Sequence, residues 1–257
     1  MKGTARGIIL KAPWEIEKLR VANQIVAEIL LKLREVIAPG ITTWELDQLA
    51  EEWVRQKGAL PAFKGYRGFP FALCVSINEE VVHGMPSKER VLKEGDIVSL
   101  DFGAIYEGYV GDAAVTIPVG RVSDEASRLI AVTRECLELA IERARIGNRV
   151  QDISATIQRH AEAQGFSVVR QFVGHGVGRS LHEGPEVPNY GRPGKGPRLQ
   201  PGMVIAIEPM VNVGGPEVEI LADGWTAVTK DRSLSAHFEH SVAITAKGPQ
   251  ILSRLED

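Results

Sequence analysis

The sequence predicts a mixed α/β fold built from two similar halves of one chain. Segments with apolar residues at helical spacing alternate with short β-rich runs. The same order of elements then returns in the second half, with glycines and acidic residues in matching places. Of the 257 residues, 44% are hydrophobic and 25% are charged, so the chain has the composition of a globular protein with a substantial core.

Composition and charge exclude several classes of protein. A net charge of -3 with scattered Lys and Arg gives no cationic stripe, so nucleic acid is not expected as a primary ligand. Two cysteines are too few for a disulfide framework or a thiolate zinc cage. Near the start, only Ile8, Ile9 and Leu10 form an apolar run, so neither a signal peptide nor a membrane span is predicted. We expect a cytoplasmic monomer.

Two amphipathic helices are expected in each half. In the first half, one helix carries apolar residues from Leu19 to Val36 and stops at Pro39-Gly40, and a second runs over about 43–57 after a Thr42/Glu45 capping box. In the second half, one helix follows Ser123 and ends at Gly147. The other runs over about 149–164.

The glycines and acids of the two halves share a fixed offset. Gly40 and Gly58 recur 107 residues later, and LKEGDIVSLD (92–101) matches LQPGMVIAIE (199–208) at the same offset, which pairs Asp101 with Glu208. Asp112 is echoed by Glu239, 127 residues later, so a loop insertion is expected in the stretch with Gly214, Gly215, Pro216, Asp223 and Gly224. A chance likeness of two helix-strand units remains the alternative. We expect one domain over 1–257, with halves of about 12–120 and 121–252.

Four carboxylates at matched positions favour a metal site over solvated surface acids. Residues 97–102 and 112–117 form a candidate hairpin, and a turn centred on Tyr106-Glu107 places Asp101 opposite Asp112. Like charges across a strand pair repel, and a cation relieves both the repulsion and the cost of burial. Pseudo-symmetry brings Glu208 and Glu239 to the same axis.

A histidine completes the expected ligand set. His175 and His182 lie in the glycine-rich stretch FVGHGVGRSLHE (172–183), and next to four carboxylates His175 is more readily a ligand than a structural histidine. Such an oxygen-rich set suits two ions of Mn(II), Fe(II), Co(II) or Zn(II) with an activated water between them, and hydrolysis is the natural chemistry. We expect Asp112 and Glu239 to bridge the ions, Asp101 to be terminal on one, and Glu208 with His175 on the other.

Five motifs in order resemble the type I methionine aminopeptidases, over about residues 11–252. They are SINEEVVHG (76–84), GDIVSLDFG (95–103), GHGVGRSLHE (174–183), PGMVIAIEPM (201–210) and DRSLSAHFEHS (231–241). The resemblance implies the pita-bread fold, a pseudo-symmetric α/β architecture with a curved antiparallel sheet covered by helices. It also implies two divalent ions on Asp101, Asp112, His175, Glu208 and Glu239.

The resemblance further implies roles for residues around the ions. His83 would contact the substrate peptide, His182 would stabilise the tetrahedral intermediate, and Glu208 would shuttle the proton of the water. A methionine pocket would be formed by aromatic and sulfur-containing side chains, with ordinary core packing as the alternative for each: Phe63, Tyr66, Phe69, Cys74, Phe172 and Trp225. Some relatives carry Cys and Tyr where this chain has Phe63 and Phe69, which leaves the shape of the pocket open.

The implied activity is removal of the initiator methionine from deformylated nascent proteins, at the ribosome, when the second residue is small and uncharged. The chain looks bacterial in type, because it lacks the cysteine-rich extension and the helical insertion of other members. Another pita-bread hydrolase, such as a prolidase, aminopeptidase P or creatinase, is the nearest alternative. A non-catalytic binding module of the same fold is a second, although all five ligand positions are acidic or histidine here.

Overall fold

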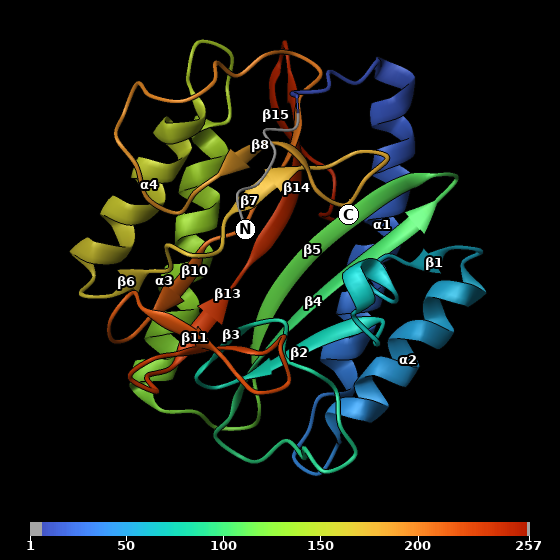
Figure 1. Ribbon diagram of the computed structural model, residues 1–257, viewed down its shortest axis with the longest axis vertical. Coiled ribbons are helices and arrows are strands. Elements are labelled where there is room, and N and C mark those ends of the chain that lie inside the picture. Colours follow the sequence, from blue (N-terminus) through green and yellow to red (C-terminus); the bar gives the residue numbers. More distant parts are fainter. Residues whose placement is uncertain (1–6, 256–257) are drawn as a thin grey trace.

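A nine-stranded antiparallel sheet with helices packed against it dominates the computed structural model, which describes residues 7–255 (Figure 1). The helices are α1 (Pro13–Val36), α2 (Thr43–Gln56), α3 (Asp124–Arg143) and α4 (Val150–Ala163), with a short 3-10 helix at Tyr66–Gly68. The sheet has the order β1-β4-β5-β14-β9-β7-β8, with β2 added to β4 and β15 to β14. These strands are β1 (Leu60–Pro61), β2 (Leu73–Ile77), β4 (Ile97–Tyr106), β5 (Tyr109–Pro118), β7 (Gly174–Gly176), β8 (Glu183–Val187), β9 (Val204–Ile207), β14 (Glu239–Thr245) and β15 (Gly248–Ile251).

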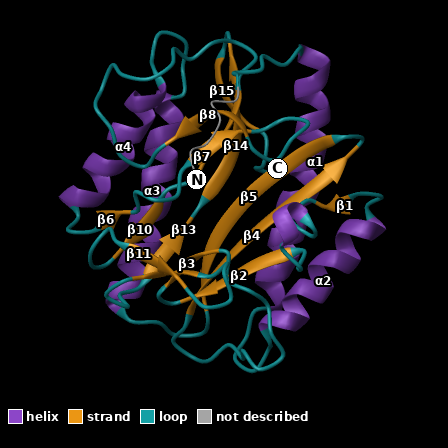
Figure 2. Cartoon of the chain, viewed as in Figure 1, coloured by secondary structure: helices purple, strands orange, loops and turns teal. Residues whose placement is uncertain are grey.

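Two three-stranded sheets lie beside the main one, in the orders β13-β10-β6 and β11-β12-β3. Their strands are β3 (Glu80–Val82), β6 (Ser167–Val168), β10 (Met210–Asn212), β11 (Val218–Ile220), β12 (Ala227–Thr229) and β13 (Ser235–His237). Figure 2 shows the strands running through the centre of the molecule, with α1 and α2 at the right of the view and α3 and α4 at the left.

The four expected helices are confirmed, and local signals explain their ends. Pro13 occupies the first turn of α1, where its missing N–H is not needed. The Thr42 side chain accepts a hydrogen bond from the Glu45 amide and the Glu45 carboxylate accepts one from the Thr42 amide, so the expected capping box begins α2. At the start of α3, the Ser123 hydroxyl accepts from the Ala126 amide.

The centre of the main sheet relates the two halves of the chain. In each half, two helices precede two neighbouring antiparallel strands, β4 and β5 in the first and β9 and β14 in the second. The inner strands of the two halves pair with each other, so that Glu239 lies opposite Ala114. The acids of both halves are thereby brought to the middle of one continuous sheet.

Alternation along these strands separates the apolar core from the acids. Val98, Leu100 and Phe102 of β4 belong to a buried cluster with α1 and α2, so Asp101 between them faces the opposite side of the sheet. In the second half, Ile205 and Ile207 of β9 belong to the cluster with α3 and α4, and Glu208 follows on the opposite side. The helices therefore cover one face and leave the acidic face free to form a site.

The register of the β4-β5 hairpin differs from the expected one. The turn lies at Glu107-Gly108 rather than at Tyr106-Glu107, and Asp101 pairs with Ala114 while Asp112 pairs with Gly103. Both turn residues have positive φ (47° and 80°), the conformation of a type I′ turn whose twist matches that of the strands. A shift by two residues preserves the face, so both acids still lie on the same side.

The stretch expected as a loop insertion is not only a loop. It contains β11 and β12, which form a hairpin, and β12 also pairs with β3 of the first half. Asp223 organises the connection, since its carboxylate accepts hydrogen bonds from the amides of Trp225 and Thr226. The added segment thus ties the two halves together and fixes the position of Trp225.

We predict that Gly111→Ala destabilises the fold, because α1 crosses β5 directly above this glycine. A Cβ at Gly111 would lie 2.5 Å from the carbonyl carbon of Ala22 and 2.6 Å from the amide nitrogen of Asn23. Backbone atoms cannot give way as a flexible side chain can, so we expect a loss of about 1–3 kcal/mol in the free energy of unfolding by urea. Gly7→Ala, with no atom within 4 Å of the added Cβ, is the control, and equal stability of both variants would contradict this account.

Candidate metal centre

One cavity brings together all the predicted site residues. It has a volume of about 290 Å³ and opens between β5, β7 and β14 on the acidic face of the sheet. The predicted site residues among its lining are Phe63, Tyr66, Phe69, Cys74, His83, Asp101, Asp112, Phe172, His175, His182, Glu208, Trp225 and Glu239. Sequence positions from 63 to 239 therefore converge on one site.

The carboxylates in this cavity are buried and incompletely bonded. Asp112 and Glu239 are each only 3% exposed. Among the described residues, no hydrogen-bond partner exists for Oδ1 of Asp101, Oδ1 of Asp112 or Oε1 of Glu239. Buried carboxylate oxygens without partners are costly, and a cation is the kind of ligand that satisfies several of them together.

Burial and mutual repulsion hold protons on these acids. Burial raises the pKa of Asp101 to about 7, with the nearby His237 opposing the rise and Glu208 adding to it. Burial also raises the pKa of Glu208 to about 7, which His175 opposes. For Asp112 and Glu239, burial and then the neighbouring acids raise the pKa well above the usual range. Without a cation, these acids therefore keep their protons to a higher pH than ordinary carboxyl groups do.

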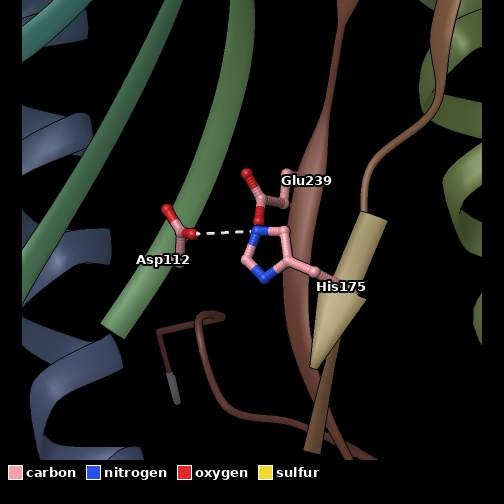
Figure 3. Close-up of side chains that lie close together, drawn as sticks. All are labelled: Asp112, His175 and Glu239. Atoms are coloured by element: carbon pink, nitrogen blue, oxygen red, sulfur yellow. Dashed lines mark ion pairs between the residues drawn. The ribbon is translucent and has the colours of Figure 1, made fainter. Parts of the chain in front are cut away.

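His175 faces the acids with one ring nitrogen. Its Nδ1 lies 2.9 Å from the carbonyl oxygen of Gly176, which suits an Nδ1–H donor and leaves Nε2 with a free lone pair. That Nε2 lies 3.6 Å from Oδ2 of Asp112 and 3.6 Å from Oε1 of Glu208. Figure 3 shows the side chains of Asp112, His175 and Glu239 pointing toward one another from three different strands.

The donor set fits divalent ions. One atom each of Asp112, His175 and Glu239 lies within 4.8 Å of the others, a spacing that a single ion can span. Glu208 adjoins this group through His175, and Asp101 contributes an oxygen without a partner. Carboxylates with one imidazole are ligands for Mn(II), Fe(II), Co(II) or Zn(II) rather than for Cu(I).

Two further histidines flank the acids. His182 lies with its Nδ1 2.8 Å from the Tyr66 hydroxyl and its ring 4.2 Å from that of His175. His83 has a positive φ of 61°, a strained conformation for a non-glycine residue, and its ring meets Phe172 edge-on. Burial lowers the pKa of His83 to about 4, with a smaller effect of His237, so its imidazole is neutral at pH 7.

Apolar side chains close the remaining wall of the cavity. Phe69 packs edge-on against Trp225 with ring centroids 5.1 Å apart, and Phe63 and Cys74 belong to the same buried cluster. Burial, followed by the charges of Asp101 and Asp112, raises the pKa of the Cys74 thiol well above its usual range, so it contributes an uncharged surface. An apolar pocket thus directly adjoins the acids.

Several lining residues were not anticipated. Arg67, Val82, Gln171, Val173 and Leu181 also line the cavity. Each of them is adjacent in the sequence to a predicted site residue, and that adjacency is the one signal that could have found them. His237, two residues before Glu239 in the fifth motif, lies with its Nε2 3.6 Å from Oε2 of Glu208 and was also missed.

We predict that the acids make the ion-free protein less stable as pH rises. The folded state holds a proton on Asp101 up to about pH 7, while the unfolded chain loses it near about pH 4. Stability is therefore lost between these values, and Asp101→Asn removes that loss. In urea unfolding with EDTA, we expect the free energy of unfolding of Asp101→Asn to rise relative to that of the wild type, by on the order of 1–3 kcal/mol, as the pH increases from 5 to 8.

Asp231→Asn is the control for this experiment. The Gly215 amide donates a hydrogen bond to the Asp231 carboxylate and lowers its pKa to about 2, so this acid is ionised in both states above pH 5. Its effect on stability should be flat over the same interval. If the stability difference between Asp101→Asn and the wild type were also independent of pH, the raised pKa of Asp101 would be contradicted.

Comparison with known proteins identifies the family. Residues 17–246 match the model of Metallopeptidase family M24. The chain is 55% identical to a methionine aminopeptidase of Clostridium acetobutylicum, over 97% of this chain and 100% of the relative, and 43% identical to that of Escherichia coli, over 97% and 95%.

Solved structures agree with this grouping. The crystal structure of a methionine aminopeptidase from Thermotoga maritima, 52% identical, has a TM-score of 0.96 over 97% of this chain and 100% of that one. A prolidase from Pyrococcus horikoshii, 25% identical, has a TM-score of 0.79 over 96% of this chain and only 64% of that one. The expected pita-bread fold is confirmed. The chain therefore belongs to metallopeptidase family M24, and within it to the group of the methionine aminopeptidases.

Proposed function

We propose that this enzyme removes the initiator methionine from deformylated nascent proteins whose second residue is small and uncharged. The observation that carries the proposal is the junction of the acidic cluster with an apolar pocket in one cavity of about 290 Å³. A free N-terminal amine suits the acids and ions, and a methionine side chain suits the pocket. The close relatives named methionine aminopeptidase support the same assignment.

Two divalent ions are proposed on Asp101, Asp112, His175, Glu208 and Glu239, with Asp112 and Glu239 bridging. Such ions supply a polarised carbonyl and a water of lowered pKa. Three unpartnered oxygens on Asp101, Asp112 and Glu239 support this ligand set. In the described part of the chain, no helix is long and apolar enough to cross a membrane. We propose a cytoplasmic monomer, folded as one domain, that acts near the ribosome.

Glu208 is proposed as the acid and base of the reaction. It lies at the end of β9 with Oε1 3.6 Å from His175, and burial raises its pKa to about 7. This is the pKa of the ion-free protein, which bound cations lower, so the proposed role rests on the position of the carboxylate, from which it can accept a proton and return it. Its place beside the other acids supports the transfer of that proton to the leaving amine.

His83 is proposed to contact the substrate peptide, and His182 to stabilise the tetrahedral intermediate. His83 is neutral at pH 7 and can donate or accept a hydrogen bond to substrate. The Tyr66 hydroxyl lies 2.8 Å from Nδ1 of His182 and orients the ring that is proposed to stabilise the developing oxyanion. Glu183, the next residue, forms a buried ion pair of 2.6 Å with Lys11 and anchors this segment.

We predict selective, metal-dependent release of methionine. Protein stripped of metal and reloaded with Mn(II) or Co(II) should release methionine from Met-Ala-Ser and cleave Leu-Ala-Ser poorly, because the pocket fits the unbranched thioether. Amino-acid analysis of the products measures both rates. Cleavage of Ala-Pro-Ala alone would instead place the enzyme with the prolidases, and no cleavage of any peptide would favour a binding module.

We also predict that Trp225→Ala raises KM for Met-Ala-Ser about tenfold or more. Trp225 packs on Phe69 and meets His83 edge-on, so its loss opens the pocket wall and removes apolar contact worth on the order of 1.5–3 kcal/mol. Trp14→Ala is the matched control, because Trp14 is 56% exposed and packs on Tyr109 outside the cavity. Steady-state kinetics of both variants checks this, and an unchanged KM for Trp225→Ala would contradict the assigned pocket.

A further inference from the structure

Besides His175, a second buried imidazole lies beside the acids, and its nitrogens make no hydrogen bond within the described chain. His237 ends β13, is 1% exposed, and within the described chain neither Nδ1 nor Nε2 makes a hydrogen bond. A buried polar group without a partner costs stability and usually has a reason to persist. The neighbouring histidines of the cavity differ in this respect, since His175 and His182 each have a partner for Nδ1.

The geometry around Glu208 suggests that reason. Oε2 of Glu208 lies 3.6 Å from Nε2 of His237, while Oε1 lies 3.6 Å from Nε2 of His175. The carboxylate therefore stands between two imidazoles, with one oxygen toward each. His237 is not part of the group of Asp112, His175 and Glu239 that lies within ion-binding distance, and besides Glu208 it lies near Asp101, whose charge acts on it.

We propose that His237 is a positioning residue for Glu208. This inference rests on the metal centre proposed above. In the ion-loaded protein the Nε2–H of His237 donates to Oε2 of Glu208, and this bond directs Oε1 toward His175 and the ions. Outer hydrogen bonds of this kind orient metal ligands, and their removal typically weakens metal binding by about 10–100-fold.

The proposal predicts effects of opposite sign for His237→Leu. The apolar side chain removes a buried imidazole without a partner, so the metal-free protein should unfold at a midpoint about 2–4 °C higher. The same change removes the donor to Glu208, so the affinity for Mn(II) should fall by about 10–100-fold. A merely structural role would lower the midpoint and leave the ion affinity of the folded protein unchanged.

Two amide variants identify the nitrogen that acts. His237→Gln places an amide N–H at about the reach of Nε2 and should keep most of the Mn(II) affinity, whereas His237→Asn reaches only as far as Nδ1 and should behave like His237→Leu. Asn189→Leu is the matched control. Both side-chain polar atoms of Asn189 also lack partners in the described chain, and Asn189 follows β8, outside the strands that carry the acids.

The experiment measures Mn(II) binding to metal-free protein by titration calorimetry and thermal unfolding of the same samples in EDTA. We expect Asn189→Leu to shift the midpoint without changing the Mn(II) affinity, and His237→Leu to change both in opposite directions. A Mn(II) affinity of His237→Leu equal to that of the wild type, or an equal loss of affinity in His237→Gln and His237→Leu, would overturn the proposal. If the wild type itself bound no Mn(II), the metal centre would fail, and this inference with it.

Discussion

The electrostatic cost of four buried carboxylates is the constraint on which the rest of the site depends. Asp101, Asp112, Glu208 and Glu239 share one face of the sheet, and burial raises the pKa of each. Protons can relieve the repulsion only while the pH is low enough, and ions can relieve it at neutral pH. The unsatisfied carboxylate oxygens that lower the stability of the ion-free protein are therefore the same atoms that would hold metal.

The pseudo-symmetric sheet is the means by which the chain assembles this cluster. Each half supplies two acids from adjacent strands, and the pairing of β5 with β14 joins the halves into one sheet. The apolar residues between the acids face the helices, so the cost of burial is offset by two separate hydrophobic cores. Asn23 of α1 adds a direct link, because its side-chain oxygen accepts a hydrogen bond from the Asp112 amide.

Features with local or repeated signals could be predicted from the sequence. Pro39-Gly40 and the Thr42 capping box fixed the helix limits, and the offset between Asp101 and Glu208 indicated that the halves share a site. The hairpin register was wrong because Glu107 adopts a positive φ that its residue type does not favour. Nothing in the composition of the insertion showed that β12 would pair with β3, and Trp225 was expected in the pocket only through the resemblance to the methionine aminopeptidases. The proximity of His237 to Glu208 depends on the tertiary fold, so no sequence pattern predicted it.

The central claim is that divalent ions compensate the buried acids. The most direct measurement is the number of Mn(II) ions that each folded chain retains at pH 7.5 after equilibrium dialysis, counted by elemental analysis in the wild type and in Asp112→Asn. The account predicts up to two ions per wild-type chain and fewer in the variant, because Asp112 is proposed to bridge both. Retention of no ions by the wild type, or equal retention by both proteins, would contradict it.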